Sequence, residues 1–157
     1  AAIEVIGNSL ELNFLEVDNA AYQLVADPKN FDVVVAPNMF GDILGDTGSL
    51  LLGSRGMSYS ANFGYQGNAV YQTAHGAAHD LAGKNVANPI GQILSAAWLL
   101  EKEFGQDKLS SAIRMAISKT LAAGFRTADI AARDSQIVST SELTERIIDT
   151  LQESSDV

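Results

Sequence analysis

The 157 residues predict an α/β fold, in which strands and helices follow one another along the chain. Three observations lead to this prediction. Residues 31–36, Phe-Asp-Val-Val-Val-Ala, are a β-branched run of strand length, typical of strands buried on both faces. Residues 69–73 are a second, shorter strand candidate. Amphipathic segments that open at Pro89 and at Asp107 have the length of helices.

The first third of the chain contains two candidate strands and two candidate helices. Leu10–Phe14 alternates apolar and polar residues, which predicts a half-buried strand. Asp18–Ala26 is expected to be a helix with Asp18 as its cap, ended by Asp27-Pro28. The strand at 31–36 then leads into a predicted helix over 40–52.

The rest of the chain is divided by Gly, Pro and a capping motif. We expect loops at 53–67 and 74–86, a strand at 69–73, and helices at 89–104, 107–123 and 139–152. Gly105 and Gly124 mark the ends of the first two of these helices. Ser139-Thr140-Ser141-Glu142 is a capping box, which predicts the start of the last one.

Composition excludes several classes of function. Residues are 46% hydrophobic and 18% charged, as in a globular domain. The net charge of −9 argues against a nucleic-acid partner, because phosphates are bound by clustered Lys and Arg. No apolar run is long enough to cross a membrane, so we expect no membrane partner. The absence of Cys excludes disulfides and thiolate sites and fits a reducing cytoplasm, the expected localisation.

Asp42 and Asp46 are the first candidate site. On a helix their four-residue spacing places both carboxylates on one face, where the like charges repel unless a cation offsets them. From spacing alone, two solvated acids near a helix start are the commoner explanation. Their position after the strand at 31–36 favours a functional site, because functional groups of α/β proteins lie beyond the carboxyl ends of such strands.

The residues around this pair resemble a known signature. Asn38-Met39-Phe40-Gly41-Asp42-Ile43-Leu44-Gly45-Asp46, followed by the turn 53–57, is similar to the isopropylmalate and isocitrate dehydrogenases, as is the stretch 17–25. In that family a third metal carboxylate precedes the first Asp of the pair at the position of Asp18. The resemblance implies that Asp18, Asp42 and Asp46 bind Mg²⁺ or Mn²⁺, with Asp18 donated by the other subunit of a homodimer.

The segment from His75 to Pro89 resembles the NAD-binding loop of the same family. The resemblance implies that NAD is bound by Gln72, His75, Gly76, Ala77, Ala78, Asp80, Leu81, Ala82, Gly83 and Asn88. A carboxylate at Asp80 accepts hydrogen bonds from both adenosine ribose hydroxyls and repels a 2′-phosphate, which favours NAD over NADP. Gly-x-Gly-x-x-Gly is absent from the chain, and the family binds NAD without it.

Four positions depart from the family pattern. Gln72 replaces a Glu, Ala77 a Ser, His79 a Pro, and Arg55 an apolar residue. These changes could mark a subfamily that uses a different hydroxy acid. His75 and His79 have the spacing of a zinc pair on a helix, but Gly76 disfavours a helix and the sequence has no further His or Cys.

The resemblance implies a partial fold of the isopropylmalate/isocitrate dehydrogenase type, with segments of two domains. Residues 1–52 would belong to a small dimer-forming domain that carries the metal carboxylates, and 53–157 to a large cofactor-binding domain. The catalytic Lys and Tyr of the family, and the Arg residues that hold its substrate, lie further toward the N-terminus. We therefore expect a fragment or one part of a split protein, which exposes apolar surface and is not a competent catalyst alone.

Two functions follow as hypotheses. The first is the NAD- and Mg²⁺-dependent oxidative decarboxylation of a small 2-hydroxy dicarboxylate of the 3-isopropylmalate or isocitrate type. The alternative is a non-catalytic paralogue or regulatory subunit with the same fold. Gln72, Ala77 and His79 favour the alternative, and the intact carboxylate trio argues against it.

Overall fold

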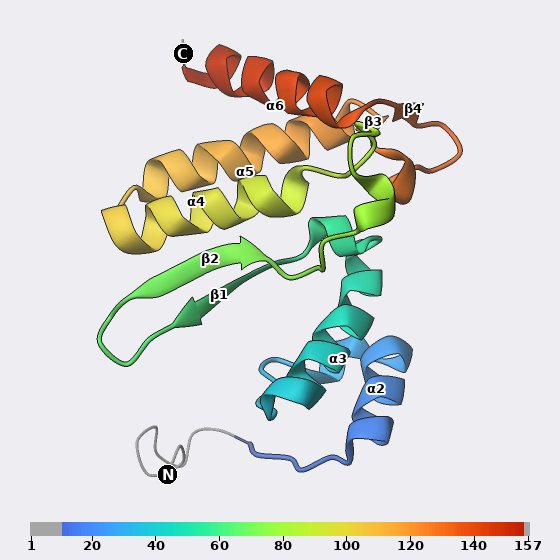
Figure 1. Cartoon of the computed structure of the whole chain (residues 1–157), viewed down its shortest axis with the longest axis vertical. Coiled ribbons are helices and arrows are strands. Elements are labelled where there is room, and N and C mark those ends of the chain that lie inside the picture. Colours follow the sequence, from blue (N-terminus) through green and yellow to red (C-terminus); the bar gives the residue numbers. More distant parts are fainter. Residues whose placement is uncertain (1–10, 156–157) are drawn as a thin grey trace. The chain divides into compact units, whose positions relative to one another are not determined.

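The computed structural model describes residues 11–155 (Figure 1). Its helices are α2 (Val17–Ala26), α3 (Asn38–Ser49), α4 (Ile90–Phe104), α5 (Asp107–Ala122) and α6 (Thr140–Ser155), and its strands are β1 (Tyr59–Phe63), β2 (Ala69–Thr73), β3 (Phe125–Arg126) and β4 (Gln136–Ile137). Single 3₁₀ turns cover residues 28–30, 50–52, 55–57, 79–81 and 128–130. The chain divides into two compact units, with the boundary in the sequence after Gly48. Among residues 11–155, no helix combines the length and apolarity that crossing a bilayer requires.

The first unit consists of α2, α3 and the extended segment between them. α2 begins after Glu16, so Asp18 lies in the first turn and the prediction that it caps the helix is wrong. α2 ends at Asp27 before Pro28, as predicted. The unit has an open apolar hollow of about 390 Å³ on its surface, lined by Ala20, Leu24, Phe31, Val34, Ala36, Gly41, Leu44, Gly45 and Gly48.

Two strands predicted for this unit do not form. Residues 31–36 and 11–14 have no strand assignment, while Leu10 lies outside the described residues. The side chains of Val33 and Val35 are 84% and 92% exposed. A strand forms only when a neighbouring strand takes up its N–H and C=O groups, and the described residues provide no such neighbour.

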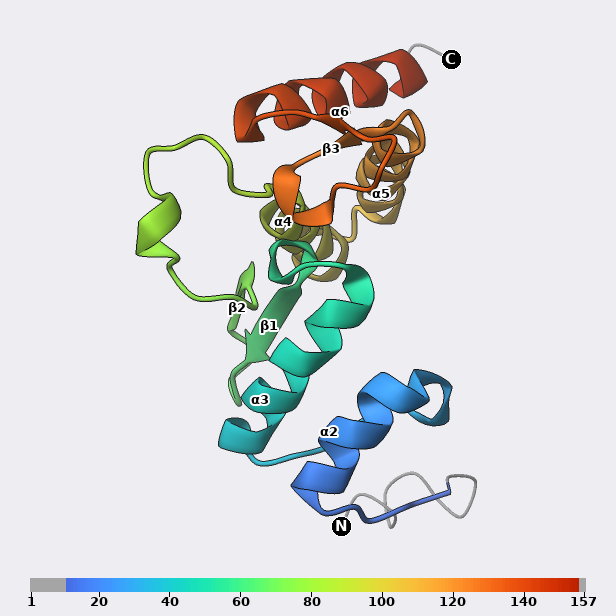
Figure 2. The same ribbon diagram turned by 90° about the vertical axis from the view of Figure 1, so that its right-hand side faces the viewer.

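The second unit is a stack of a β-hairpin, two antiparallel helices and a last helix (Figures 1 and 2). β1 and β2 pair antiparallel, from Tyr59↔Thr73 to Phe63↔Ala69, and both pack on α4. α4 packs on α5, and α5 on α6. The helix predicted over 40–52 is observed as α3 followed by a 3₁₀ turn, and the helices predicted in this unit are confirmed with small shifts at their ends.

The prediction of one loop over 53–67 is wrong, because residues 59–63 form β1. These residues alternate only weakly, and they become a strand by pairing with β2. The sequence also predicted neither β3 nor β4, which pair in parallel over two residues each. Two-residue strands are too short to produce a periodic pattern.

The core of the second unit lies where α4, α5 and α6 meet. Ile90 and Leu143 are fully buried there, together with Ala116, Ile117 and Ile147. Each large apolar side chain contributes roughly 1.5–3 kcal/mol when it is buried. Gly91 brings α4 directly onto the turn before β1, since a Cβ at this position would lie 2.6 Å from the carbonyl oxygen of Ser58.

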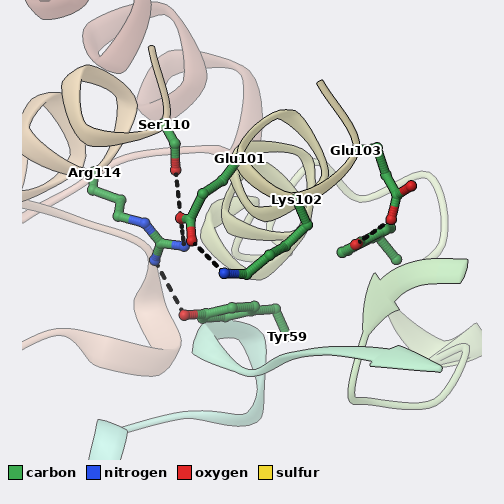
Figure 3. A network of polar contacts seen from close by, with 7 residues as sticks. Tyr59, Glu101, Lys102, Glu103, Ser110 and Arg114 are labelled. Atoms are coloured by element: carbon green, nitrogen blue, oxygen red, sulfur yellow. Dashed lines mark hydrogen bonds and ion pairs between the residues drawn. The ribbon is translucent and has the colours of Figure 1, made fainter. Parts of the chain in front are cut away.

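The hairpin is held to α4 by aromatic and polar contacts. Trp98 of α4 meets the rings of Tyr59, Phe63 and Tyr71 edge-on, at centroid distances of 5.6–6.0 Å. Figure 3 shows the polar contacts near Tyr59 and Glu103. Glu103 accepts a 2.7 Å hydrogen bond from the Tyr71 hydroxyl. Burial, together with the Glu103 carboxylate, raises the pKa of Tyr71 to about 12.

A second set of polar contacts joins α4 to α5. The Glu101 carboxylate lies 3.0 Å from Lys102 and accepts a 3.3 Å hydrogen bond from Ser110 (Figure 3). Arg114 donates a 3.1 Å hydrogen bond to the Tyr59 hydroxyl. These contacts link the hairpin, α4 and α5 on one side of the unit. They hold β2 in place, and with it the start of the loop that follows Thr73.

Candidate functional site

The acidic pair lies on α3, as the sequence predicts. Asp42 and Asp46 are one helical turn apart on the same face, with Asp42 exposed and Asp46 half-buried. Asn38 lies one turn before Asp42 and donates a 3.0 Å hydrogen bond from Nδ2 to its Oδ2. The three side chains form a row of oxygen donors along α3, the ligand type that Mg²⁺ and Mn²⁺ prefer.

Asp18, the third predicted ligand, is exposed in the first turn of α2. Its Oδ1 accepts a 2.7 Å hydrogen bond from the backbone N–H of Asn19. Within residues 11–155, no three His, Cys, Asp or Glu side chains lie close enough together to hold a metal ion. The chain therefore does not bring the trio together by itself. The prediction assigns Asp18 to the neighbouring subunit, so the shared site stays a prediction.

The candidate cofactor loop (residues 74–88) connects β2 to α4. In Figure 2 the loop, in light green, projects away from the helices and returns where α4 begins. Tight turns close its middle, where Leu81 N–H donates to the carbonyl of Ala78 at 2.8 Å. Ala78 has a left-handed φ of 45°, which costs a non-glycine residue roughly 1–2 kcal/mol. Such strain occurs more often at binding sites than elsewhere.

Side chains of the candidate cofactor loop are mostly exposed and open to a ligand. Asp80 lies in the 3₁₀ turn 79–81 and is exposed. His75 is half-buried, and its Nδ1 is 2.9 Å from the carbonyl oxygen of Gly76. His79 is exposed. The exposed backbone next to Gly76 and Gly83 leaves space for a nucleotide to approach closely.

Gln72 lies on the face of the hairpin that points away from α4. Side chains alternate along a strand, and its neighbour Tyr71 faces Trp98 of α4. Gln72 is paired across the strands with Ser60, while its carbonyl accepts a 2.8 Å hydrogen bond from Ser95 of α4. The backbone is thus fixed, and the uncharged amide is exposed two residues before the candidate cofactor loop.

The side chain of Asn88, predicted to contact NAD, is used within the protein. Its Nδ2 donates to Asp129 at 3.1 Å, and its Oδ1 accepts from the N–H of Ile90 at 3.0 Å. These two bonds fix the orientation of the Asn88 side chain at the end of the candidate cofactor loop. Burial tends to raise the pKa of Asp129, but hydrogen bonds from Ser54 and Asn88 outweigh it and lower the pKa.

Two residues of this region were missed by the sequence reasoning. Asp129 supports Asn88 from 41 positions further along the chain. Asn85 contacts the start of α6, 56 positions away. Nothing local in the sequence indicates such long-range partners. The residue type of Asn85 indicates only its backbone conformation, since Asn adopts a left-handed φ more often than most residues.

Comparisons with known proteins agree with this arrangement. Residues 4–147 match the family model described as isocitrate/isopropylmalate dehydrogenase. The chain is 45% identical over 141 residues to a 3-isopropylmalate dehydrogenase of Prochlorococcus marinus and 50% identical over 139 residues to one of Chlorobium luteolum, matches that cover 90% and 88% of the chain. These matches span only 40% and 39% of the length of the two relatives.

Solved structures share the fold. Isocitrate dehydrogenase of Methylococcus capsulatus matches with a TM-score of 0.87 and 32% identity, over 96% of this chain and 44% of that one. The TT0538 protein of Thermus thermophilus matches with a TM-score of 0.86 and 40% identity, over 96% of this chain and 30% of that one. The fold is thus a partial α/β fold of this type. On these findings the chain belongs to the isocitrate/isopropylmalate dehydrogenase family.

Proposed function

We propose that this chain is the C-terminal part of an enzyme that oxidises and decarboxylates a 2-hydroxy dicarboxylate, with NAD as hydride acceptor and Mg²⁺ or Mn²⁺ as metal. The row of Asn38, Asp42 and Asp46 on α3 carries the proposal, because it presents two aligned carboxylates in the family's signature segment. The names of the relatives favour 3-isopropylmalate as substrate: the 3-isopropylmalate dehydrogenases are 45–50% identical, and the isocitrate dehydrogenase is 32% identical.

Asp42 and Asp46 would hold the divalent cation through their carboxylate oxygens. The hydrogen bond from Asn38 restrains one oxygen of Asp42, whose side chain is exposed to solvent. When bound, the cation supplies Lewis acidity toward the substrate's hydroxyl and keto oxygens. Two carboxylates alone are few ligands for a hard cation, so we propose that Asp18 of the partner subunit completes the site in a homodimer.

The candidate cofactor loop would hold NAD, which supplies the hydride acceptor when bound. The Asp80 carboxylate, exposed in its 3₁₀ turn, is suited to accept hydrogen bonds from the two hydroxyls of the adenosine ribose. The same negative charge repels a ribose 2′-phosphate. The glycine-rich backbone around it provides N–H donors without side chains in the way.

A chimera tests the proposal directly. The N-terminal part of the Chlorobium luteolum 3-isopropylmalate dehydrogenase would be joined to this chain in place of the matching residues. We expect NADH formation at 340 nm with 3-isopropylmalate and Mn²⁺, and slower formation with isocitrate. Asp42→Asn should abolish turnover, while Asp134→Asn, an exposed acid outside the site, should not.

Gln72, Ala77 and His79 favour the second candidate, a non-catalytic or regulatory paralogue, and the uncharged Gln72 is the change with the clearest chemical consequence. It is exposed beside the candidate cofactor loop, at a position where the family pattern has a carboxylate. A paralogue of this kind would give a folded chimera that binds Mn²⁺ but forms no NADH. If Gln72→Glu then restored turnover, loss of this one charge would explain the loss of activity.

A further inference from the structure

The two halves of the candidate cofactor loop are held in different ways. Within residues 11–155, the hydrogen bonds of residues 75–84 are local, such as that from Lys84 N–H to the carbonyl of Leu81 at 3.1 Å. From Asn85 onward the hydrogen bonds reach other elements. Asn85 contacts α6, and Asn88 contacts Asp129. The first half, which carries most of the predicted NAD contacts, therefore depends on how its end is anchored.

Asn85 forms that anchor through three hydrogen bonds to the first turn of α6. Its carbonyl accepts from Thr140 N–H at 3.0 Å, and its Oδ1 accepts from Ser141 N–H at 3.1 Å. Its Nδ2 donates to Ser141 Oγ at 2.8 Å. Asn85 also has a left-handed φ of 54°, a conformation that turns the chain sharply at this point.

The turn of α6 that receives these bonds is itself fixed. Ser139 and Glu142 form the capping box predicted from the sequence, with Ser139 N–H donating to Glu142 at 2.8 Å and Glu142 N–H donating to Ser139 Oγ at 3.3 Å. Leu143, next along α6, is fully buried in the core. Asn85 thus ties the candidate cofactor loop to the capped first turn of α6, next to the buried core of the second unit.

We propose that Asn85 is a positioning residue, whose side-chain amide holds residues 75–83 in the conformation that accepts the nucleotide. This inference rests on the proposed NAD binding. A loop with only local hydrogen bonds samples several conformations, and apparent affinity falls in proportion to the fraction that is competent to bind. The three bonds of Asn85 restrict that sampling without touching the nucleotide.

Three substitutions separate the side-chain hydrogen bonds of Asn85 from its backbone conformation. Asn85→Gly keeps the left-handed backbone accessible but removes both side-chain bonds. Asn85→Asp keeps an oxygen that can accept from Ser141 N–H, so it should restore much of the tether. Ser141→Ala weakens the tether from the α6 side and leaves Asn85 intact. Ser111→Ala, an exposed serine of α5, is the matched control.

The experiment combines amide hydrogen exchange of the nucleotide-free chain with calorimetric titration of NAD⁺, both far below the melting temperature. We expect Asn85→Gly to speed exchange at Leu81, Ala82 and Lys84 and to weaken NAD⁺ binding roughly tenfold. Asn85→Asp should restore both to within about threefold of wild type, and Ser111→Ala should match wild type.

Failure of this inference differs from failure of the proposed function. Unchanged exchange at the three amides in Asn85→Gly, or unchanged NAD⁺ affinity despite faster exchange, overturns the positioning role. The positioning role is also overturned if Asn85→Asp restores neither the exchange rates nor the NAD⁺ affinity and Asn85→Gly only lowers the melting temperature. Absence of NAD⁺ binding by the wild-type chain overturns the proposed function, whatever the exchange rates are.

Discussion

Asn38 donates a 3.0 Å hydrogen bond to the carboxylate of Asp42, one turn further along α3. The bond orders a carboxylate that is exposed to solvent and lies one turn before Asp46. Asn38 therefore acts on the proposed metal site through Asp42, because its hydrogen bond restricts the orientation of the Asp42 carboxylate. Supporting bonds of this kind typically affect metal affinity measurably.

Asn38→Ala should weaken Mn²⁺ binding by roughly five- to tenfold, because loss of one solvent-exposed hydrogen bond costs about 1–1.5 kcal/mol. Asn30→Ala is a close control, since Asn30 donates a similar 3.1 Å bond to Asp27 in the same unit. Mn²⁺ titration by electron paramagnetic resonance measures both. Equal effects of the two variants would show that Asn38 has no special role.

Asp80→Lys should weaken NAD⁺ binding by at least tenfold, because it replaces an acceptor for the ribose hydroxyls with a cation. The same change should improve binding of NADP⁺, whose 2′-phosphate a Lys can pair with. Asp134→Lys controls for the change in net charge. Calorimetry with both nucleotides measures the effect, and an unchanged NAD⁺ affinity would refute the ribose assignment.

Gly91→Ala should destabilise the second unit by about 1–3 kcal/mol, because its Cβ would lie 2.6 Å from the carbonyl of Ser58 and 2.8 Å from that of Gly56. Backbone atoms cannot move aside as a flexible side chain can. Gly45→Ala, in α3, meets nothing within 4 Å and should leave this unit unchanged. Urea unfolding followed by Trp98 fluorescence compares them. A stable Gly91→Ala variant would contradict the observed packing.

Stability should fall in acid partly through Asp129 and Glu142, whose pKa values are both lowered in the folded protein. For Asp129 burial acts against hydrogen bonds from Ser54 and Asn88, which outweigh it; for Glu142 the hydrogen bonds from Ser139 are the main cause. Each carboxylate contributes stability above its ordinary pKa, and the contribution is lost as pH falls through the lowered value.

Asp129→Asn and Glu142→Gln should therefore be less stable than wild type at pH 7 and approach it below about pH 4. Glu145→Gln, an exposed change on the same helix as Glu142, is the control. Thermal unfolding between pH 3 and 7 measures the difference. If the difference in melting temperature between variant and wild type stayed constant from pH 3 to pH 7, the proposed effect of these two pKa values on stability would be contradicted.

Tyr71 should deprotonate near pH 12, because burial and then the Glu103 carboxylate disfavour its phenolate. Its contribution to stability is present below the ordinary pKa of about 10 and is lost as pH rises through about 12. Absorbance at 295 nm during an alkaline titration measures this. Tyr71→Phe should remove the late transition, whereas Tyr65→Phe, at an exposed position of the hairpin tip, should leave it.

The sequence predicted the helices well, because each of their ends carries a local signal. Gly105 and Gly124 have left-handed φ angles of 60° and 94° at the ends of α4 and α5, as expected of helix-terminating glycines. Ser139 and Glu142 form the expected capping box. These signals depend on the residues within one or two turns, so they can be read without knowledge of the rest of the fold.

The strands were predicted less well, because pairing depends on distant residues. Val33 and Val35 have strong β propensity, yet residues 31–36 form no strand where the described residues provide no neighbour. β1 forms from weakly alternating residues because β2 pairs with it. The same limit applies to the candidate site: the placement of Asp42 and Asp46 on one helix was predicted from their spacing, whereas the contacts of Asp129 and Asn85 span 41 and 56 positions and were missed.

Mn²⁺ binding to the purified chain tests the central claim, that the α3 carboxylates form a divalent-cation site, most directly. Wild type, Asp42→Asn, Asp46→Asn and Asp134→Asn would be titrated under identical conditions. We predict that either α3 substitution weakens Mn²⁺ binding by at least tenfold while Asp134→Asn has no effect. Equal Mn²⁺ affinity in all four proteins would contradict the metal site, and with it the function proposed for this chain.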